Sequence, residues 1–227
     1  YAYVKEHIYP KLKEIIEAYK NGTGFSIFMD EDGLISAGSG LDQVTWMDVR
    51  VGDWVATPRH GKPVEINALW YNALKVMESL SVYYDEDPKP YHLLAEQVRE
   101  SFNREFWNEE KECCTSGPIG SEAYEKGWWE TTGAEMVLWP RFGIATERQR
   151  NLFLKTIESN PEAFSEFGIN WYPFRKEKNH FWRACWVSWT LGLSEAAGES
   201  GNKEFLKKLI YAQVRNVLLN KSFHEVM

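Results

Sequence analysis

The residues whose types are best suited to catalysis or ligand binding lie close together between Thr45 and Asn72. This run holds three carboxylates, three cations and three indole rings: Asp48, Asp53, Glu65, Arg50, Arg59, Lys62, Trp46, Trp54 and Trp70. Charged groups beside aromatic rings are favourable sites for shifted pKa values, and loops on a rigid scaffold often carry binding and catalytic groups. Two interpretations fit the composition: an active-site loop, or a solvated loop with ordinary surface ion pairs.

Aromatic residues are abundant throughout the chain. They make up 15% of the 227 residues and include 11 Trp. An aromatic ring offers a flat apolar face with a polar edge, which suits the stacked face of a sugar. Protein interfaces and helical cores are also rich in Trp, so the composition indicates a carbohydrate site without excluding these alternatives.

This run also contains a series of specific sequence motifs. Thr45-Trp46-Met47-Asp48 is followed by Gly52-Asp53-Trp54-Val55, Thr57-Pro58-Arg59, Gly61-Lys62-Pro63-Val64-Glu65-Ile66-Asn67 and Leu69-Trp70-Tyr71-Asn72. It resembles the signature of the glycogen-debranching amylo-alpha-1,6-glucosidase family of glycoside hydrolases. The resemblance implies an (α/α)6 toroid and hydrolysis of alpha-linked glucosides with inversion. It also implies an acid at the position of Asp48.

The chemistry of inversion agrees with that role. One protonated carboxylic acid lies beside the leaving oxygen and one carboxylate activates water across the ring, at a separation of roughly 6.5 to 9.5 Å. Desolvation beside Trp46 raises the pKa of a carboxyl and keeps it protonated near neutral pH. Asp53, next to Trp54, is the competing assignment, and the resemblance favours Asp48 because the family's acid falls at the first of these two positions. By resemblance, Glu225 near the end of the chain is the candidate base, and a solvated surface residue is the alternative.

Further residues supply hydroxyl partners or stacking walls for a sugar. The predicted substrate-binding residues are Trp46, Arg50, Asp53, Trp54, Arg59, Lys62, Glu65, Asn67, Trp70, Trp128, Glu130, His180, Trp182 and Arg183. For each Trp, ordinary helix packing is the alternative. No Cys, His or Asp cluster accompanies His180, so we expect no metal ligand there. Because two carboxylates and water suffice for inversion, we expect no cofactor.

Apolar periodicity predicts an all-α domain. Residues recur at helical spacing near 4–19, 64–83, 91–106, 132–139, 147–158, 181–197 and 203–219. A small β-hairpin with an Asp-Gly turn is expected near residues 25–36, and long loops at 108–130 and 160–178. We interpret residues 1–227 as a single glycosidase catalytic domain. It has fewer helices than a full toroid, so we expect an incomplete ring, truncated at both ends.

Charge and composition restrict the partners. The net charge of -7 argues against nucleic acid, which requires a basic footprint. No apolar run reaches the roughly 18 residues of a membrane span. The three Cys lack disulfide or zinc spacing, which makes a reducing compartment, and hence the cytoplasm, the expectation. The expected partner is an oligosaccharide or polysaccharide substrate, with self-association or the remainder of a longer chain covering exposed apolar faces.

Other functions stay open at this point. Residues 108–178 depart from the debranching pattern, so another toroidal glycosidase specificity, such as an alpha-mannoside, is an alternative. A helical carbohydrate-binding domain without catalysis is a second alternative. A toroidal sugar epimerase or isomerase is a weaker third one, because no pair of His stands out as its base.

Overall fold

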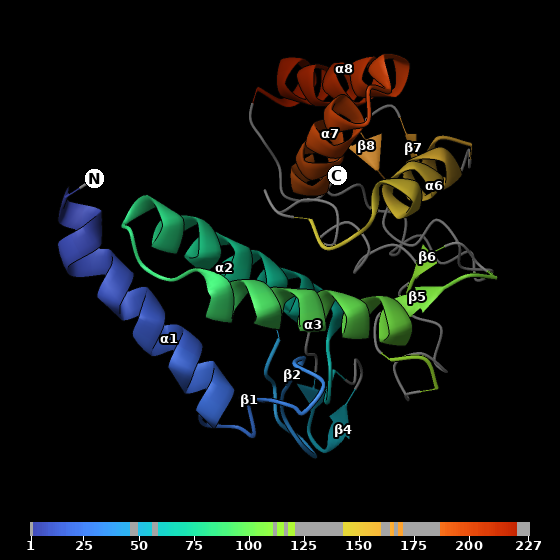
Figure 1. Ribbon diagram of the computed structural model, residues 1–227. Helices are drawn as coiled ribbons and strands as arrows, with labels where there is room; N and C mark the ends of the chain where they lie inside the picture. The colour runs from blue at the N-terminus through green and yellow to red at the C-terminus, as the bar shows by residue number, and fades with distance from the viewer. Residues whose placement is uncertain are drawn as a thin grey trace. The chain divides into compact units, whose positions relative to one another are not determined.

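The computed structural model describes residues 2–45, 50–55, 59–110, 113–115, 118–120, 143–159, 164–165, 168–169 and 187–221. These residues are mainly helical and divide into two compact units. Figure 1 traces the helices and short strands of each unit. In the ranges described, no helix is both long enough and apolar enough to cross a bilayer.

The first unit begins with an amphipathic helix, as predicted. A π-helical turn, η1 (Val4–Ile8), leads into α1 (Tyr9–Asn21), which buries Tyr9 and Ile16. These two residues are seven apart and therefore lie on one helix face. Gly22 ends the helix with a φ of 96°, a backbone conformation that glycine adopts readily. The predicted stop at Asn21-Gly22 is confirmed.

Two long helices form the centre of this unit. α2 (Val64–Tyr83) and α3 (Lys89–Phe106) pack side by side, as Figure 1 shows. Both were predicted, with boundaries that differ by at most two residues. Their buried apolar positions recur every three or four residues, which places them on one face of each helix. These positions include Ala68, Tyr71, Leu74 and Met77 on α2, and Ala95, Val98, Phe102 and Phe106 on α3.

The predicted hairpin near residues 25–36 is confirmed. β1 (Phe28–Met29) pairs antiparallel with β2 (Ile35–Ser36), with Met29 opposite Ile35. The Gly33 amide donates to the Asp30 carbonyl at 2.9 Å. Gly33 has a φ of +84°, and a Cβ there would meet Gln97 and Val98 of α3 at 3.3 Å. The turn therefore requires glycine both for its backbone and for its close approach to α3.

A second hairpin lies in the run that we predicted as mostly loop. β3 (Arg50–Val51) pairs with β4 (Trp54–Val55) across a turn in which Gly52 has a φ of 60°. The sequence did not indicate this hairpin, because strands of two residues are too short to show an alternating apolar pattern.

The second unit is a small group of helices. It contains α6 (Glu147–Ser159), α7 (Val187–Glu199) and α8 (Lys203–Asn220), and α7 packs against both of the others. The Asn202 side chain caps α8 by accepting a hydrogen bond from the Phe205 amide at 3.1 Å. Its core is formed by Phe153, Leu154, Ile157, Leu193, Ala196, Ala197, Phe205, Leu209 and Ala212. The helices predicted at 147–158 and 203–219 are confirmed.

Short strands also occur inside the two predicted long loops. They are β6 (Cys113–Cys114), β7 (Phe164–Ser165) and β8 (Gly168–Ile169), and β5 (Trp107–Asn108) comes directly after α3. β7 and β8 pair antiparallel. The helix predicted at 132–139 and the first part of the one predicted at 181–197 lie outside the described residues.

Candidate functional site

The segment that carries Asp48 is closed at its base by backbone hydrogen bonds. The Ala37 amide donates to the Gly61 carbonyl at 2.8 Å, and the Gly61 amide donates back to the Ala37 carbonyl at 2.9 Å. Ala37 and Gly61 thus form an antiparallel bridge, and residues 38–60 leave and return at the same point. α2 begins at Val64, directly after this bridge. The structure therefore links the β1–β2 hairpin, the loop and α2.

Lys62 binds the turn of the β1–β2 hairpin. Its ammonium lies 2.8 Å from a carboxylate oxygen of both Asp30 and Asp32. The hydrogen bond from Lys62 is the main cause of a lowered pKa at Asp30, and the Glu31 amide adds to it. Burial acts to lower the pKa of Lys62, but the two carboxylates outweigh it, so that this pKa is raised. Lys62 therefore links the segment before α2 to the hairpin through two salt bridges.

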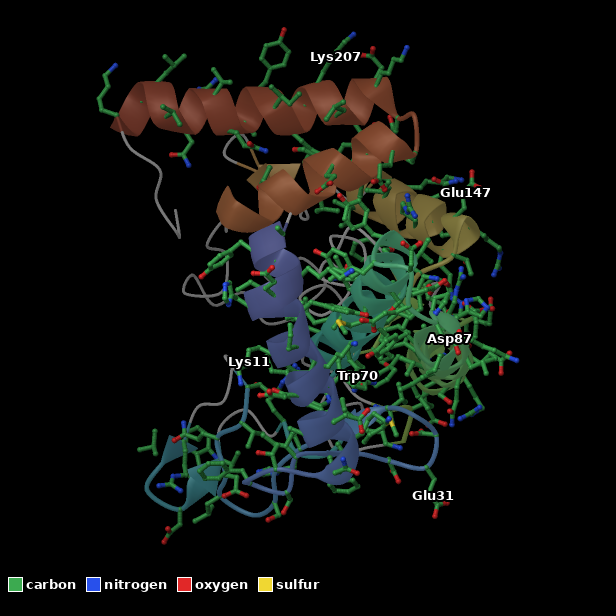
Figure 2. All side chains as sticks on the ribbon, turned by 60° about the vertical axis from the view of Figure 1, so that its left-hand side comes forward. Lys11, Glu31, Trp70, Asp87, Glu147 and Lys207 are labelled. Carbon is green, nitrogen blue, oxygen red and sulfur yellow. The ribbon has the colours of Figure 1, made fainter. Side chains whose placement is uncertain are left out.

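Asn67 and Trp70 of α2 bind the backbone of the same hairpin. The Asn67 amide accepts from the Ile35 N–H at 2.6 Å and donates to the Ile35 carbonyl at 3.0 Å. The Trp70 indole N–H donates to the Gly33 carbonyl at 3.1 Å. The Trp70 ring also stacks on Tyr19 of α1, with centroids 6.1 Å apart, and it is labelled in Figure 2. The described contacts of both side chains are with the protein itself.

Arg59 and Glu65 form a buried ion pair. The Arg59 guanidinium donates to the Glu65 carboxylate, and each side chain is only 2% exposed. Glu65 lies in the first turn of α2, where the helix dipole favours a negative charge. This pair fixes the returning end of the 38–60 segment to the start of α2.

The β3–β4 hairpin is exposed. Trp54 is 64% exposed, so an indole face is accessible, and Asp53 is exposed in the turn beside it. Arg50 is also exposed, and its guanidinium donates to the Leu41 carbonyl at 3.0 Å. This hairpin offers an aromatic surface beside the position of Asp48 in the chain.

The remaining predicted residues lie outside the described ranges. They are Asp48, Glu225, Trp46, Trp128, Glu130, His180, Trp182 and Arg183. Their roles, and the separation expected between Asp48 and Glu225, stay predictions. Across the described ranges, no group of three His, Cys, Asp or Glu side chains could hold a metal ion.

Sequence reasoning missed the partners of the motif residues. Asp30 and Asp32 bind Lys62, while Gln97 and Ser101 of α3 donate to the Glu31 and Asp32 carbonyls at 2.9 and 2.8 Å. The Asp-Gly turn signalled the hairpin, but no local pattern indicated which helix side chains would bind it.

Comparison with known proteins gives a family and a fold. The family described as amylo-alpha-1,6-glucosidase matches residues 2–155. No protein with curated function matches at a significant level.

Three solved structures from Thermus thermophilus share the fold. A GH63 mannosylglycerate hydrolase in complex with Tris is 17% identical, with a TM-score of 0.54, over 73% of this chain and 39% of that one. The glucose complex of a GH63 mannosylglycerate hydrolase is 16% identical, with a TM-score of 0.53, over 73% and 41%. An uncharacterized conserved protein is 17% identical, with a TM-score of 0.55, over 73% and 42%. The matched part therefore spans about two fifths of each of these proteins.

Proposed function

Because the chain belongs to the amylo-alpha-1,6-glucosidase family, we propose that it forms catalytic structure of an inverting glycosidase that cleaves alpha-linked glucosides. The proposed substrate is the alpha-1,6 branch glucose of glycogen or limit dextrin. The observation that carries this proposal is the family match, which contains the whole Thr45–Asn72 run. The single-domain interpretation of residues 1–227, the incomplete ring and self-association stay predictions.

The proposed reaction uses two carboxyl groups. Asp48 donates its proton to the glycosidic oxygen as the bond to the anomeric carbon breaks. Glu225 takes a proton from water, whose oxygen bonds to that carbon from the opposite face. The products are a free hydroxyl on the remaining chain and glucose of inverted anomeric configuration. Each step balances without a cofactor.

The local geometry supports Asp48 over Asp53 as the acid. Asp53 occupies the exposed turn of the β3–β4 hairpin, where water solvates its carboxylate. A glycosidase acid lies beside the scissile bond, in a site from which bulk water is largely excluded. The exposure of Asp53 carries this distinction, because the Ala37–Gly61 bridge and the Arg59–Glu65 pair anchor the whole 38–60 segment, which contains both carboxyl groups. Such anchoring suits a residue that must hold a proton at one position.

The predicted binding residues divide into two groups by burial. Trp54 and Arg50 are exposed, and we propose that they contact the substrate beyond the cleaved glucose. Arg59 and Glu65 are buried against each other, and we propose that they shape the site from behind its surface. For Trp46, Trp128, Glu130, His180, Trp182 and Arg183, sugar contact is proposed from the sequence.

A mannoside is the second candidate substrate. Two of the solved structures with this fold are described as mannosylglycerate hydrolases. Their identity to this chain is 16–17%, so the similarity supports a shared fold and leaves the sugar to be tested.

The test is glucose release from a branched limit dextrin, with the anomer scored by NMR immediately after release. We expect beta-glucose from the unchanged chain and a loss of at least about a thousandfold in Asp48→Asn, because the donor proton is gone. Asp53→Asn is the matched carboxyl comparison: as a predicted sugar contact Asp53 should affect KM, while kcat should be retained because Asp53 donates no proton in the proposed reaction. Mannosylglycerate hydrolysis without glucose release would favour the second substrate. Alpha-glucose as the first product would contradict inversion, and full activity in Asp48→Asn would contradict the assigned acid.

A further inference from the structure

The outer edge of β2 has a gap that proline creates. Its inner edge faces β1, where the Asp30 amide donates to the Leu34 carbonyl at 2.8 Å. The N–H and carbonyl groups of Ile35 and Ala37 face the other way, toward residues 61–67. In an antiparallel ladder, pairs that exchange both hydrogen bonds recur at every second residue. Since Ala37 and Gly61 form such a pair, the next would join Ile35 to Pro63.

Pro63 cannot complete that pair, because proline has no backbone N–H. The side-chain amide of Asn67 replaces the missing peptide group. Its oxygen accepts from the Ile35 N–H at 2.6 Å, and its nitrogen donates to the Ile35 and Pro63 carbonyls, both at 3.0 Å. Asn67 is 0% exposed. A buried side chain thus continues the ladder that closes residues 38–60.

Resting on the proposed function, we propose that Asn67 is a positioning residue for the segment that carries Asp48. Its amide has two donor hydrogens, and both are used by backbone carbonyls. No donor hydrogen remains for a sugar hydroxyl and the side chain is 0% exposed, so its action on the substrate passes through the loop. Sugar contact, the role that the sequence suggested for Asn67, is the alternative that the test separates.

Neighbouring contacts make the same base rigid. Lys62, between the two paired positions, binds Asp30 and Asp32. Trp70, one turn after Asn67 on α2, binds the Gly33 carbonyl. Gly38, the first residue of the closed segment, donates to the Phe25 carbonyl at 2.9 Å. Loss of the Asn67 amide would therefore loosen one link in a base that other contacts still hold.

The test compares Asn67→Asp with Asn103→Asp in the full chain. Aspartate retains the acceptor but lacks both donor hydrogens, whereas the described hydrogen bond of Asn103 goes to the Arg99 carbonyl within α3 and not to the hairpin or to residues 61–67. We expect hydrogen exchange in residues 35–55 to be on the order of tenfold faster in Asn67→Asp and unchanged in α8. For hydrolysis, kcat should fall while KM stays the same. Asn103→Asp should leave both unchanged.

A second variant covers the case in which Asn67→Asp does not fold. Gly61 has a φ of +85° with open space around it, so Gly61→Ala strains the same base from the other strand. It should reproduce both the faster exchange and the selective fall in kcat. Unchanged exchange with a raised KM in Asn67→Asp would overturn the inference and assign sugar contact. If neither the variants nor the unchanged chain hydrolyse any sugar, the proposed function fails, while the exchange data still decide the role of Asn67.

Discussion

Two parts of the molecule satisfy the hydrogen bonds of their backbones in different ways. Around the β1–β2 hairpin, four helix side chains bind hairpin backbone groups: Asn67, Trp70, Gln97 and Ser101. In the second unit, α7 and α8 satisfy their own backbones and pack through buried apolar residues such as Leu193 and Phe205. Because β1 and β2 are only two residues long, most peptide groups beside them in the chain have no partner in the β-ladder. Buried peptide groups nevertheless require hydrogen bonds. Polar side chains from α2 and α3 meet that need.

The comparison changes how the motif residues are understood. Asn67 and Trp70 have the residue types of sugar ligands, yet their described side-chain hydrogen bonds go to backbone groups of the hairpin and of Pro63. Part of a family signature can thus specify the support of the 38–60 loop. Substitutions in each part measure how strongly its stability depends on its polar contacts.

The largest effect is expected at the buried ion pair of the first unit. Arg59→Met or Glu65→Met alone removes one partner of this buried ion pair, which should cost about 3–5 kcal/mol of unfolding free energy. The double variant should be closer to the unchanged chain than either single variant, because both charges of the pair are then replaced by apolar groups. Urea unfolding of all four proteins measures this.

The exposed pair of α8 provides the control. Lys207 binds Glu204 at 2.8 Å, with both side chains more than half exposed. Lys207→Met should leave the urea midpoint unchanged, since solvent already screens this pair. A double variant of Arg59 and Glu65 as unstable as the singles would contradict the ion-pair explanation.

The sequence predicted helices well and contacts poorly, for a physical reason. The buried face of each long helix appears in the sequence as apolar residues three or four apart, so α2 and α3 were found almost to the residue. The hairpin was found from its Asp-Gly turn. The partners of Lys62, Asn67 and Trp70 lie 30, 32 and 37 residues away in the chain. Contacts over such separations leave no local period, and backbone acceptors have no residue type to recognise.

A smaller effect is expected at the cap of α8. Asn202→Ala removes the acceptor for the Phe205 amide and should cost about 1 kcal/mol. Asn202→Ser keeps a capping oxygen and should recover most of that loss. Both are measured by urea unfolding. We expect the loss of this local cap to lower the unfolding free energy by less than Asn67→Asp does, because Asn67 joins segments far apart in the chain. An equal or larger loss at Asn202 would contradict that ranking.

The smallest effect is a difference in acid sensitivity between the units. Asp30 has a lowered pKa, chiefly from Lys62, so its contribution to stability is present above its unfolded pKa of about 3.9 and disappears as the pH falls through the folded value. Lys62→Met should therefore be less stable than the unchanged chain at pH 6. This difference in stability, the gap, should narrow toward about pH 3. Urea midpoints across this range measure the gap.

The second unit supplies the contrast for this titration. Glu158 also has a lowered pKa, but the hydrogen bond from Asn202 is the main cause and Lys208 is a lesser one. Lys208→Met should accordingly show a smaller gap at pH 6, and less narrowing in acid, than Lys62→Met. A gap for Lys62→Met that stays constant from pH 6 to pH 3 would contradict this explanation. It would mean that packing of the Lys62 methylene groups, and not the attraction between its ammonium and Asp30, holds the hairpin turn.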